Sequence, residues 1–329
     1  MYQGTSFNQD VTRKFNLANS AAIEVTTDVR FRPVSSDQAR SYYHIIPASL
    51  APHLVSISAV ITTTQGQAKV QKVDVSSLPS DLKTVLKNKN AAGDVVVYKL
   101  STTKDEQVQG VVTFQITELF KRRKSAFPSQ VAIKEELSVM FTDTKHYVSL
   151  YPTKKQTTTF NHNSPTLHFY TPDATAEKKL KQLKYGPFKD VPALTYDEVM
   201  LHYRENRAQP VFTEVKKTIE VSHWGNILVD EYYELFNDAA AIKGEFGRVD
   251  YQHWNPQVAQ YAVKSLETHL PHYIRGLYYW DYIGNISTST AFRDEEDVRF
   301  RIEPRFPVFG QWKIDWSQGY NMPTRFHLL

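Results

Sequence analysis

Residues 215–236, VKKTIEVSHWGNILVDEYYELF, alternate between apolar and polar side chains over most of their length. Successive side chains of a β-strand leave opposite faces of a sheet, so this period of two predicts two half-buried strands. The strands meet at residues 223–226, where Gly225 and Asn226 tolerate the positive φ of a tight hairpin turn. The predicted apolar face consists of Val215, Ile219, Val221, Ile227, Val229, Tyr233 and Leu235.

The same pattern occurs near the N-terminus, in VTRKFNLANSAAIEVTTDVRF at residues 11–31. An ungapped shift of 204 positions places Val11 on Val215 and Phe15 on Ile219, and the later apolar positions also coincide. Identities are few, so a chance match is the alternative. The preserved apolar parity favours a duplicated β-unit.

Turn-forming residues separate short runs of β-branched and aromatic residues in both halves of the chain, which is typical of antiparallel sandwiches. We therefore expect a mainly β fold, with two tandem antiparallel β-sandwich-like domains and a few short helices. The predicted domains are residues 1–170, an N-terminal β-sandwich, and residues 211–329, a second β-rich domain. Residues 171–210, punctuated by proline, form the predicted helical or extended linker. From the repeat starts, the first unit spans about 160 residues and the second about 115, so we expect the second to be truncated.

Three short helices are expected within this β-rich chain. Residues 79–88 have one apolar stripe and an acidic first turn. Residues 173–185, DATAEKKLKQLKY, have little apolar face and predict an exposed helix. The third helix starts at Asn255, a good N-cap that is followed by Pro256.

The composition narrows the functional classes. With 41% hydrophobic and 22% charged residues the chain is globular, and its net charge of +4 gives no reason to expect a nucleic-acid partner. There are no cysteines, which excludes disulfides, thiolate metal sites and cysteine nucleophiles. The 12 glycines are scattered singly, so no phosphate-binding loop and no cofactor are predicted.

Three polar clusters invite functional interpretations, and each has a simpler one. Residues 294–297, DEED, offer carboxylates for glycosidic chemistry, but four adjacent acids repel one another and favour a solvated turn. His269 and His272 have metal-like spacing, but the intervening proline disrupts a helical arrangement, so no metal site is predicted. The basic run at residues 121–124, KRRK, is expected to be a solvated loop rather than an anion site.

Four ordered stretches carry a family resemblance. They are VSHWGNILVDEYYELF (221–236), YPTKKQTTTF (151–160), YIGNISTS (282–289), and PRFPVFGQW (304–312) followed by GYNMP (319–323). These segments resemble ribophorin I, the accessory subunit of the endoplasmic-reticulum oligosaccharyltransferase. The motifs run from residue 151 to residue 323, whereas the first 120 residues resemble the family only in outline.

The resemblance implies a non-catalytic lumenal subunit that supports transfer of oligosaccharide from dolichyl pyrophosphate to Asn of N-x-S/T sequences. In that family catalysis belongs to another subunit. The implied partners are the other oligosaccharyltransferase subunits, including the catalytic one, and nascent acceptor polypeptides. The implied location is the lumen of the endoplasmic reticulum. Since neither a signal peptide nor a membrane span is found in residues 1–329, the resemblance implies that the signal peptide has been removed and that a C-terminal membrane helix lies outside this chain.

Site residues follow from the same motifs. Asn285, in the sequon Asn285-Ile286-Ser287, is the candidate glycan attachment point. The candidate partner contacts are Trp224 in the hairpin turn and four residues of the proline-bound segment, Arg305, Phe306, Phe309 and Trp312. Core packing is the alternative for that segment.

Two rival functions remain open from the residues alone. A carbohydrate-binding β-sandwich would use tryptophans as sugar platforms, and all five, Trp224, Trp254, Trp280, Trp312 and Trp316, fall in the second half. A glycosidase would use a carboxylate pair from residues 294–297.

Overall fold

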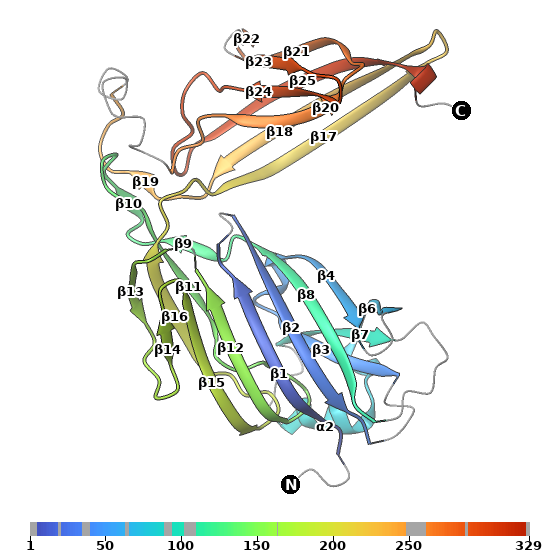
Figure 1. The fold of residues 1–329 in the computed structure, drawn as a ribbon, viewed down its shortest axis with the longest axis vertical. Coiled ribbons are helices and arrows are strands. Elements are labelled where there is room, and N and C mark those ends of the chain that lie inside the picture. Colours follow the sequence, from blue (N-terminus) through green and yellow to red (C-terminus); the bar gives the residue numbers. More distant parts are fainter. Residues whose placement is uncertain are drawn as a thin grey trace. The chain divides into compact units, whose positions relative to one another are not determined.

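The protein is mainly β, with several antiparallel sheets and one short α-helix among the residues described (Figure 1). The structure is a computed structural model that describes residues 5–18, 21–34, 40–62, 66–88, 94–101, 110–162, 164–247, 261–286 and 289–326. The mainly β architecture of these residues confirms the predicted fold class.

The chain divides into two compact units. Unit 1 comprises residues 1–124 and 140–204, and unit 2 comprises residues 125–139 and 205–329. Residues 125–139 thus belong to the second unit although they precede much of the first one in sequence, which no local sequence pattern indicates.

Unit 1 is built around an eight-stranded sheet in the order β14-β15-β12-β1-β2-β8-β4-β5. Its pairs are antiparallel except that β12 runs parallel to β1. Smaller sheets have the orders β3-β7-β6 and β13-β16-β11-β9, of which β9 falls mostly within residues 125–139 of unit 2, and the helix α2 contributes Leu82 and Leu86 to the core. The elements are β1 (Phe7–Asn16), β2 (Ala22–Arg32), β3 (Ser41–Pro47), β4 (Leu54–Ile61), β5 (Gly66–Gln67), β6 (Lys69–Val73), α2 (Ser80–Asn88), β7 (Val95–Ser101), β8 (Val112–Lys121), β9 (Lys124–Ala126), β11 (Ser138–Thr144), β12 (Thr153–Asn161), β13 (Leu167–Tyr170), β14 (Glu177–Lys179), β15 (Gln182–Val191) and β16 (Glu198–Arg204).

Unit 2 packs a five-stranded sheet, β17-β18-β25-β21-β22, against a three-stranded sheet, β20-β24-β23. Ile227, Val229 and Leu235 of β18 and Val298 and Phe300 of β24 belong to the core between them. A short parallel pair, β10-β19, adds residues of the 125–139 segment to this unit. The elements are β10 (Gln130–Val131), β17 (Pro210–Ser222), β18 (Asn226–Asn237), β19 (Ala241–Ile242), β20 (Leu266–Pro271), β21 (Arg275–Asp281), β22 (Gly284–Asn285), β23 (Thr290–Arg293), β24 (Asp297–Ile302), β25 (Lys313–Pro323) and the 3-10 turn η3 (Thr324–Phe326).

The two hairpins that the sequence relates share one register. In β1–β2, Val11 lies opposite Val29 and Phe15 opposite Val25. In β17–β18, Val215 lies opposite Tyr233 and Ile219 opposite Val229. Each of these four positions in unit 2 is displaced by 204 from its counterpart in unit 1, so the strand pairing agrees with the proposed duplication.

The turn of the second hairpin also follows the sequence. Gly225 has a φ of +85°, a value that a side chain disfavours, whereas Asn226 already begins β18. On the predicted apolar face of β18, Ile227, Val229 and Leu235 are buried and Tyr233 is partly buried. The corresponding face of β17 is not buried, because β17 is the first strand of its sheet and most of its residues are exposed.

The region expected to be a linker is different from the prediction. Residues 171–204 contain β14, β15 and β16, which pair within the sheets of unit 1. The expected helix at 173–185 is wrong: Leu183 and Tyr185 are fully buried on β15, and strand pairing outweighs the helix propensity of the Ala- and Lys-rich stretch. The helix predicted at 79–88 is confirmed as α2. The start of the helix predicted at Asn255 lies outside the described residues.

No helix among the described ranges is long and apolar enough to cross a membrane.

Burial at repeated positions predicts unequal mutational effects. Phe15 is fully buried and stacks on Phe160 with ring centroids 4.6 Å apart, whereas Ile219, at the equivalent position of unit 2, is 57% exposed. We expect Phe15→Ala to lower the free energy of unfolding of unit 1 by about 3–5 kcal/mol, because it leaves a core cavity. Ile219→Ala should change that of unit 2 by no more than about 0.5 kcal/mol. Denaturant unfolding of both variants measures the difference, and equal losses would contradict the assignment of the two environments.

Candidate functional site

The segment that joins β24 to β25 carries most of the predicted contact residues. Arg305 in this segment donates two hydrogen bonds to the carboxylate of Asp281, from Nε at 2.6 Å and from Nη2 at 3.1 Å. The same Nη2 lies within hydrogen-bond distance of the carbonyl oxygens of Gly284 (3.1 Å) and Asn285 (3.3 Å). The Arg305 hydrogen bond lowers the pKa of Asp281. Arg305 thus anchors the turn between β21 and β22 and is engaged within its own unit.

Aromatic rings on both sides of this segment form an open apolar pocket. Phe246, Phe306, Trp312 and the stem of Lys313 line a hollow of about 380 Å³. The Trp312 ring meets Phe306 edge-on at 5.8 Å and Phe246 at 5.5 Å between centroids. Phe306 is 39% exposed, so its ring is within reach of a partner. A hollow of this size lined by aromatic rings suits an apolar side chain of another polypeptide.

Phe309 is a core residue rather than a surface contact. It is fully buried and packs against Trp312 at 5.4 Å and Phe246 at 5.3 Å between ring centroids. Its prediction as a partner contact is therefore corrected. Within PRFPVFGQW, Val308 and Phe309 are both fully buried, in two different core clusters, whereas Phe306 is partly exposed.

Trp224 lies apart from this segment in sequence and in secondary structure, in the turn between β17 and β18. Its side chain is 97% exposed, and its backbone N–H is bonded to the Ser222 hydroxyl at 3.2 Å. The exposed indole ring is accessible to a partner, and its role as a contact stays a prediction.

Asn285 is exposed on β22, at the other edge of the five-stranded sheet from β17. Exposure is what glycan attachment requires. Ser287, the hydroxyl residue of the sequon, lies outside the described residues. Asn285 remains a candidate attachment point next to the Arg305 segment.

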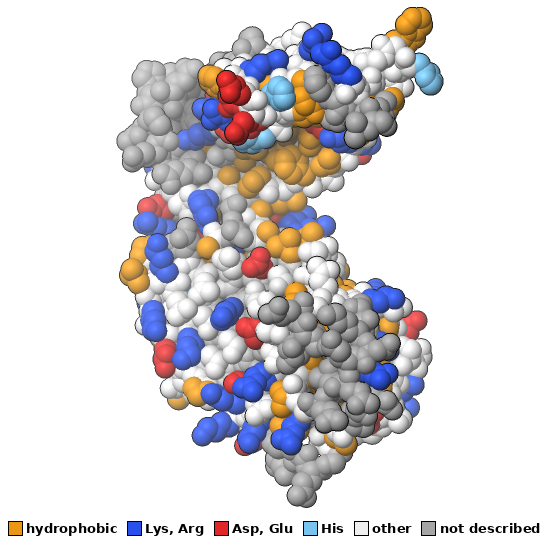
Figure 2. All heavy atoms as spheres, turned by 45° about the vertical axis from the view of Figure 1, so that its right-hand side comes forward, with side chains coloured by type: hydrophobic (Ala, Val, Ile, Leu, Met, Phe, Trp, Pro, Cys, Tyr) orange, Lys and Arg blue, Asp and Glu red, His pale blue; other side chains and the backbone are white. Residues whose placement is uncertain are grey.

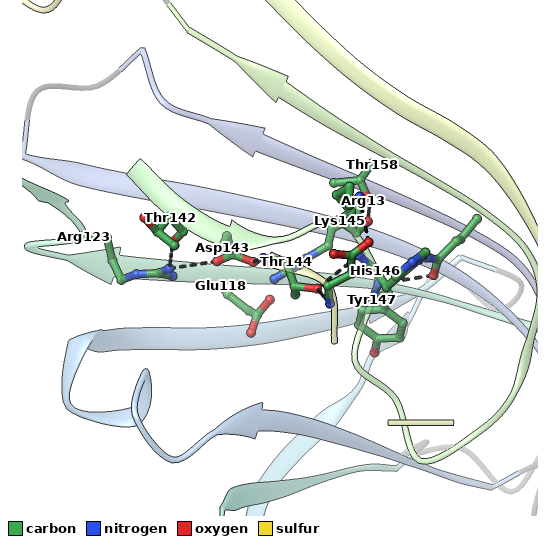
Figure 3. Close-up of polar contacts among 12 residues, drawn as sticks. Arg13, Glu118, Arg123, Thr142, Asp143, Thr144, Lys145, His146, Tyr147 and Thr158 are labelled. Atoms are coloured by element: carbon green, nitrogen blue, oxygen red, sulfur yellow. Dashed lines mark hydrogen bonds and ion pairs between the residues drawn. The ribbon is translucent and has the colours of Figure 1, made fainter. Parts of the chain in front are cut away.

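Unit 1 contains a buried network of charged groups that sequence analysis missed (Figure 3). Asp143 on β11 accepts from Arg13 of β1 at 3.0 Å and from Arg123 at 2.9 Å, and Arg123 also donates to the carbonyl of Thr142. The guanidinium of Arg13 lies over the ring of Phe15, 4.3 Å from its centroid. A carboxylate held by two arginines is the arrangement that a buried charge requires.

The basic run at 121–124 is therefore not a fully solvated loop. Arg123 faces the Asp143 carboxylate, and the ammonium of Lys124 donates to the carbonyl of Leu17 at 2.8 Å while the residue itself is buried. The prediction failed because charge runs show no periodicity that would separate inward from outward residues.

A second buried cluster surrounds His44. Its Nε2 lies 3.1 Å from Glu118 and its Nδ1 2.8 Å from the hydroxyl of Tyr147, which in turn is 3.2 Å from the hydroxyl of Tyr42. Burial raises the pKa of Tyr42 to about 12, although hydrogen bonds to its neighbours oppose this shift. All four side chains are almost fully buried. An imidazole and carboxylate pair of this kind resembles acid–base machinery, but its burial denies a substrate access, so its role is structural.

Lys145 forms a third polar centre at the rim of unit 1. Its ammonium lies 3.0 Å from Asp173 and 2.7 Å from Asp197. Burial by itself would raise the pKa of Asp173, but hydrogen bonds from Thr175 and the ion pair with Lys145 outweigh it and lower the pKa to about 2.

The acidic turn at 294–297 does not assemble a catalytic pair. The Asp294 carboxylate accepts the backbone N–H groups of Glu296 and Asp297, which lowers its pKa, and a general acid requires the opposite shift. Asp297 pairs with His269, whose ring is exposed. Over the ranges that the structure describes, no three His, Asp or Glu side chains are placed to hold a metal ion.

These features define a β-rich scaffold whose ionisable clusters are largely buried and whose two most exposed aromatic side chains among the described residues, Trp224 and Tyr282, lie on unit 2. The family model for ribophorin I matches residues 7–329, and the chain belongs to this family. Known relatives agree. The chain is 29% identical over 314 residues to "Dolichyl-diphosphooligosaccharide--protein glycosyltransferase subunit 1A" of Arabidopsis thaliana, covering 95% of this chain and 50% of the relative.

Two further relatives carry related names. Subunit 1 of the same glycosyltransferase from Caenorhabditis elegans is 30% identical over 331 residues, with coverage of 99% and 54%. Subunit 1B of Arabidopsis thaliana is 28% identical over 319 residues, with coverage of 96% and 66%. The chain thus spans about half the length of the first two relatives.

Several members of the described sites carried no signal in the sequence. Phe246 and Lys313 complete the pocket, and Asp281 fixes Arg305, but they are distant from one another along the chain. Only the aromatic content of the second half and the proline-bound segment indicated that a surface of this kind would lie there.

Two phenylalanines of the same segment should behave differently. Phe309→Ala removes a fully buried ring and should lower the free energy of unfolding of unit 2 by about 3–5 kcal/mol. Phe306→Ala removes a ring at the rim of the open pocket and should cost less than about 1.5 kcal/mol. Chemical denaturation tests both, and a larger loss for Phe306→Ala would refute the inward and outward assignment.

The lowered pKa of Asp173 predicts that unit 1 loses stability in acid. Its pKa falls from 3.8 to about 2 in the folded protein, so its stabilisation is complete above pH 4 and is lost as the pH falls from about 4 towards 2. At neutral pH it should contribute about 1–2 kcal/mol after allowance for its partial exposure. Asp173→Asn should remove this contribution and flatten the stability of unit 1 over the same pH range. If Asp173→Asn leaves the pH dependence of the stability of unit 1 unchanged, the Asp173–Lys145 ion pair is not the source of the acid lability.

Proposed function

We propose that this chain forms part of a non-catalytic subunit of the oligosaccharyltransferase complex and supports N-linked glycosylation of nascent proteins. The observation that carries the proposal is the match of the ribophorin I family model over residues 7–329. The names of the relatives point to the same complex, which transfers oligosaccharide from dolichyl pyrophosphate to Asn of N-x-S/T sequences.

In this proposal another subunit carries out catalysis. The polar clusters of this chain support that part of the proposal. The His44–Glu118 pair is enclosed, the Asp143 carboxylate is held by two arginines, and the Asp294 carboxylate accepts backbone hydrogen bonds. Each has a structural role, and none presents a raised-pKa acid or an activated base to a substrate.

The contribution of unit 2 on this proposal is contact with neighbouring subunits. Exposed aromatic side chains are the groups that dominate protein interfaces, because they bury a large apolar area at a small entropic cost. Phe306 and Trp312 at the pocket and Trp224 at the hairpin turn are the proposed contacts. Arg305 precedes Phe306 and is held by Asp281. Nascent acceptor polypeptides are a further proposed partner of the same surfaces.

The proposed location is the lumen of the endoplasmic reticulum, with membrane attachment through a part of the protein outside these residues. Asn285 is the proposed glycan attachment point, because its side chain is exposed on an edge strand. A glycan there would flank the Arg305 segment and would limit how closely a partner approaches that edge.

Affinity purification from detergent-solubilised microsomes tests the proposal. The natural protein that contains these residues should recover the other subunits of the glycosyltransferase, including the catalytic one. Phe306→Ala should reduce their recovery several-fold at unchanged expression. Phe169→Ala, which removes a ring with a similar exposed fraction from unit 1, serves as the matched control. Recovery of the natural protein without any of these subunits would refute the assignment, and equal recovery with both variants would exclude the pocket as a contact.

A further inference from the structure

β17 presents a row of exposed apolar side chains at one edge of unit 2. β17 pairs with β18 along its whole length and is the terminal strand of its sheet among the described residues. Val215, Ile219 and Val221 lie on the face that on β18 forms the core, yet they are 55%, 57% and 59% exposed. Hydrophobic side chains gather along this side of unit 2 (Figure 2). A long, apolar, unpaired edge is a template for another strand.

Unit 1 contains the covered version of the same element. The equivalents of these three residues are Val11, Phe15 and Leu17, and each is 0% exposed. The two hairpins share their register, so the difference does not come from a shift or a reversal of the strand. The difference in exposure comes from the segments that pack against β1.

The cover of β1 is supplied by residues 138–161. β12 runs parallel to β1, and its Phe160 lies opposite Phe15 and stacks on it. Phe141 on β11 meets the same ring edge-on at 5.7 Å. The ladder continues past β1, where the N–H of Leu17 donates to the carbonyl of Asn161 at 2.8 Å. One parallel strand and its preceding segment thus cover β1 around Phe15, while Val11 packs into the core cluster that contains Tyr42 and Tyr151.

The one basic residue on the apolar face of each strand, Arg13 on β1 and Lys217 on β17, is also buried in unit 1 and exposed in unit 2. Arg13 on β1 is buried against Asp143 of the covering segment. Lys217, its equivalent on β17, is half exposed and pairs with Glu231 of the neighbouring strand at 2.7 Å. Unit 2 therefore satisfies this charge within the hairpin, so an added strand would cover three apolar side chains and a lysine that is already paired.

We propose that β17 is a docking edge for one further β-strand, which runs parallel to it and covers Val215, Ile219 and Val221 as β12 covers Val11, Phe15 and Leu17. The occupant is a segment of the additional sequence that the longer subunit 1 relatives carry, since the matched region accounts for 50% and 54% of two of them. The strand alternates apolar and polar residues, and its N–H and C=O groups exchange main-chain hydrogen bonds with the free edge. This inference does not depend on the proposed function.

Site-specific cysteine labelling tests the proposal, because these 329 residues contain no cysteine. Ile219→Cys is placed both in this chain and in the full natural polypeptide, purified in detergent without other subunits. Maleimide labelling is followed by mass spectrometry of the peptide that contains the thiol. Tyr282→Cys, at a position that is 82% exposed in the same unit, is the control.

We expect the thiol at position 219 to be labelled rapidly in this chain and at least ten-fold more slowly in the full polypeptide, with the thiol at 282 labelled equally in both. Equal labelling at 219 overturns the proposal. Protection that needs another subunit, or that appears in this chain only at high concentration, also overturns it, since the strand then belongs to a different protein or to a second copy.

Further variants test which face of β17 is covered and whether the added strand runs parallel to it. Ile219→Lys in the full polypeptide should restore labelling of Val221→Cys, because a charge would enter the apolar contact. Thr218→Lys, on the opposite face, should not. For the direction, the β17 cysteine is combined with single cysteines placed one at a time along the added strand, and disulfide formation is scored. Moving the β17 cysteine from position 219 to 221 should move the cross-linked position two residues towards the C-terminus of the added strand. A move towards its N-terminus means an antiparallel strand and overturns the proposal.

Discussion

Each unit of this protein depends on covering the apolar face of a long hairpin. A sheet with alternating residues is stable in water only if its apolar face packs against a second layer. In unit 1 the eight-stranded sheet is covered on β1 by the segment that leads into the parallel strand β12, and aromatic stacking between Phe15 and Phe160 lies at that point. In unit 2 the three-stranded sheet covers β18 and leaves β17 open. The same hairpin thus has two environments within one chain.

The buried polar groups follow from that architecture. Long sheets bring side chains from distant parts of the sequence onto one inner face, and some of these are charged. Each charge is then paired within the core. Arg13 and Arg123 share Asp143, and His44 joins Glu118 to a tyrosine pair. Removing one partner of such a set destabilises the fold because it leaves a buried charge unpaired, so these residues help to fix strand positions.

Much of the fold was predictable from the period-two pattern, which located the β17–β18 hairpin, its turn at Gly225 and its relation to residues 11–31. That residues 125–139 belong to unit 2 was not predictable, since no local pattern encodes which core a connecting strand joins. The helix expected at 173–185 failed because pairing with β12 buries Leu183 and Tyr185. At the surface of unit 2 the segment 304–312 was recognisable, but only packing could show that Phe309 points inward while Phe306 points outward.

Hydrogen exchange of the backbone amides of this chain in solution tests the central claim most directly, namely that equivalent hairpin strands are covered in unit 1 and open in unit 2. Amides of β1 and β2 should exchange slowly throughout, because both strands have neighbours on each side. In β18 they should also exchange slowly, whereas in β17 the amides directed away from β18 should exchange at least a hundred-fold faster than their equivalents in β1. Uniform protection along β17, equal to that of β1, would contradict the account.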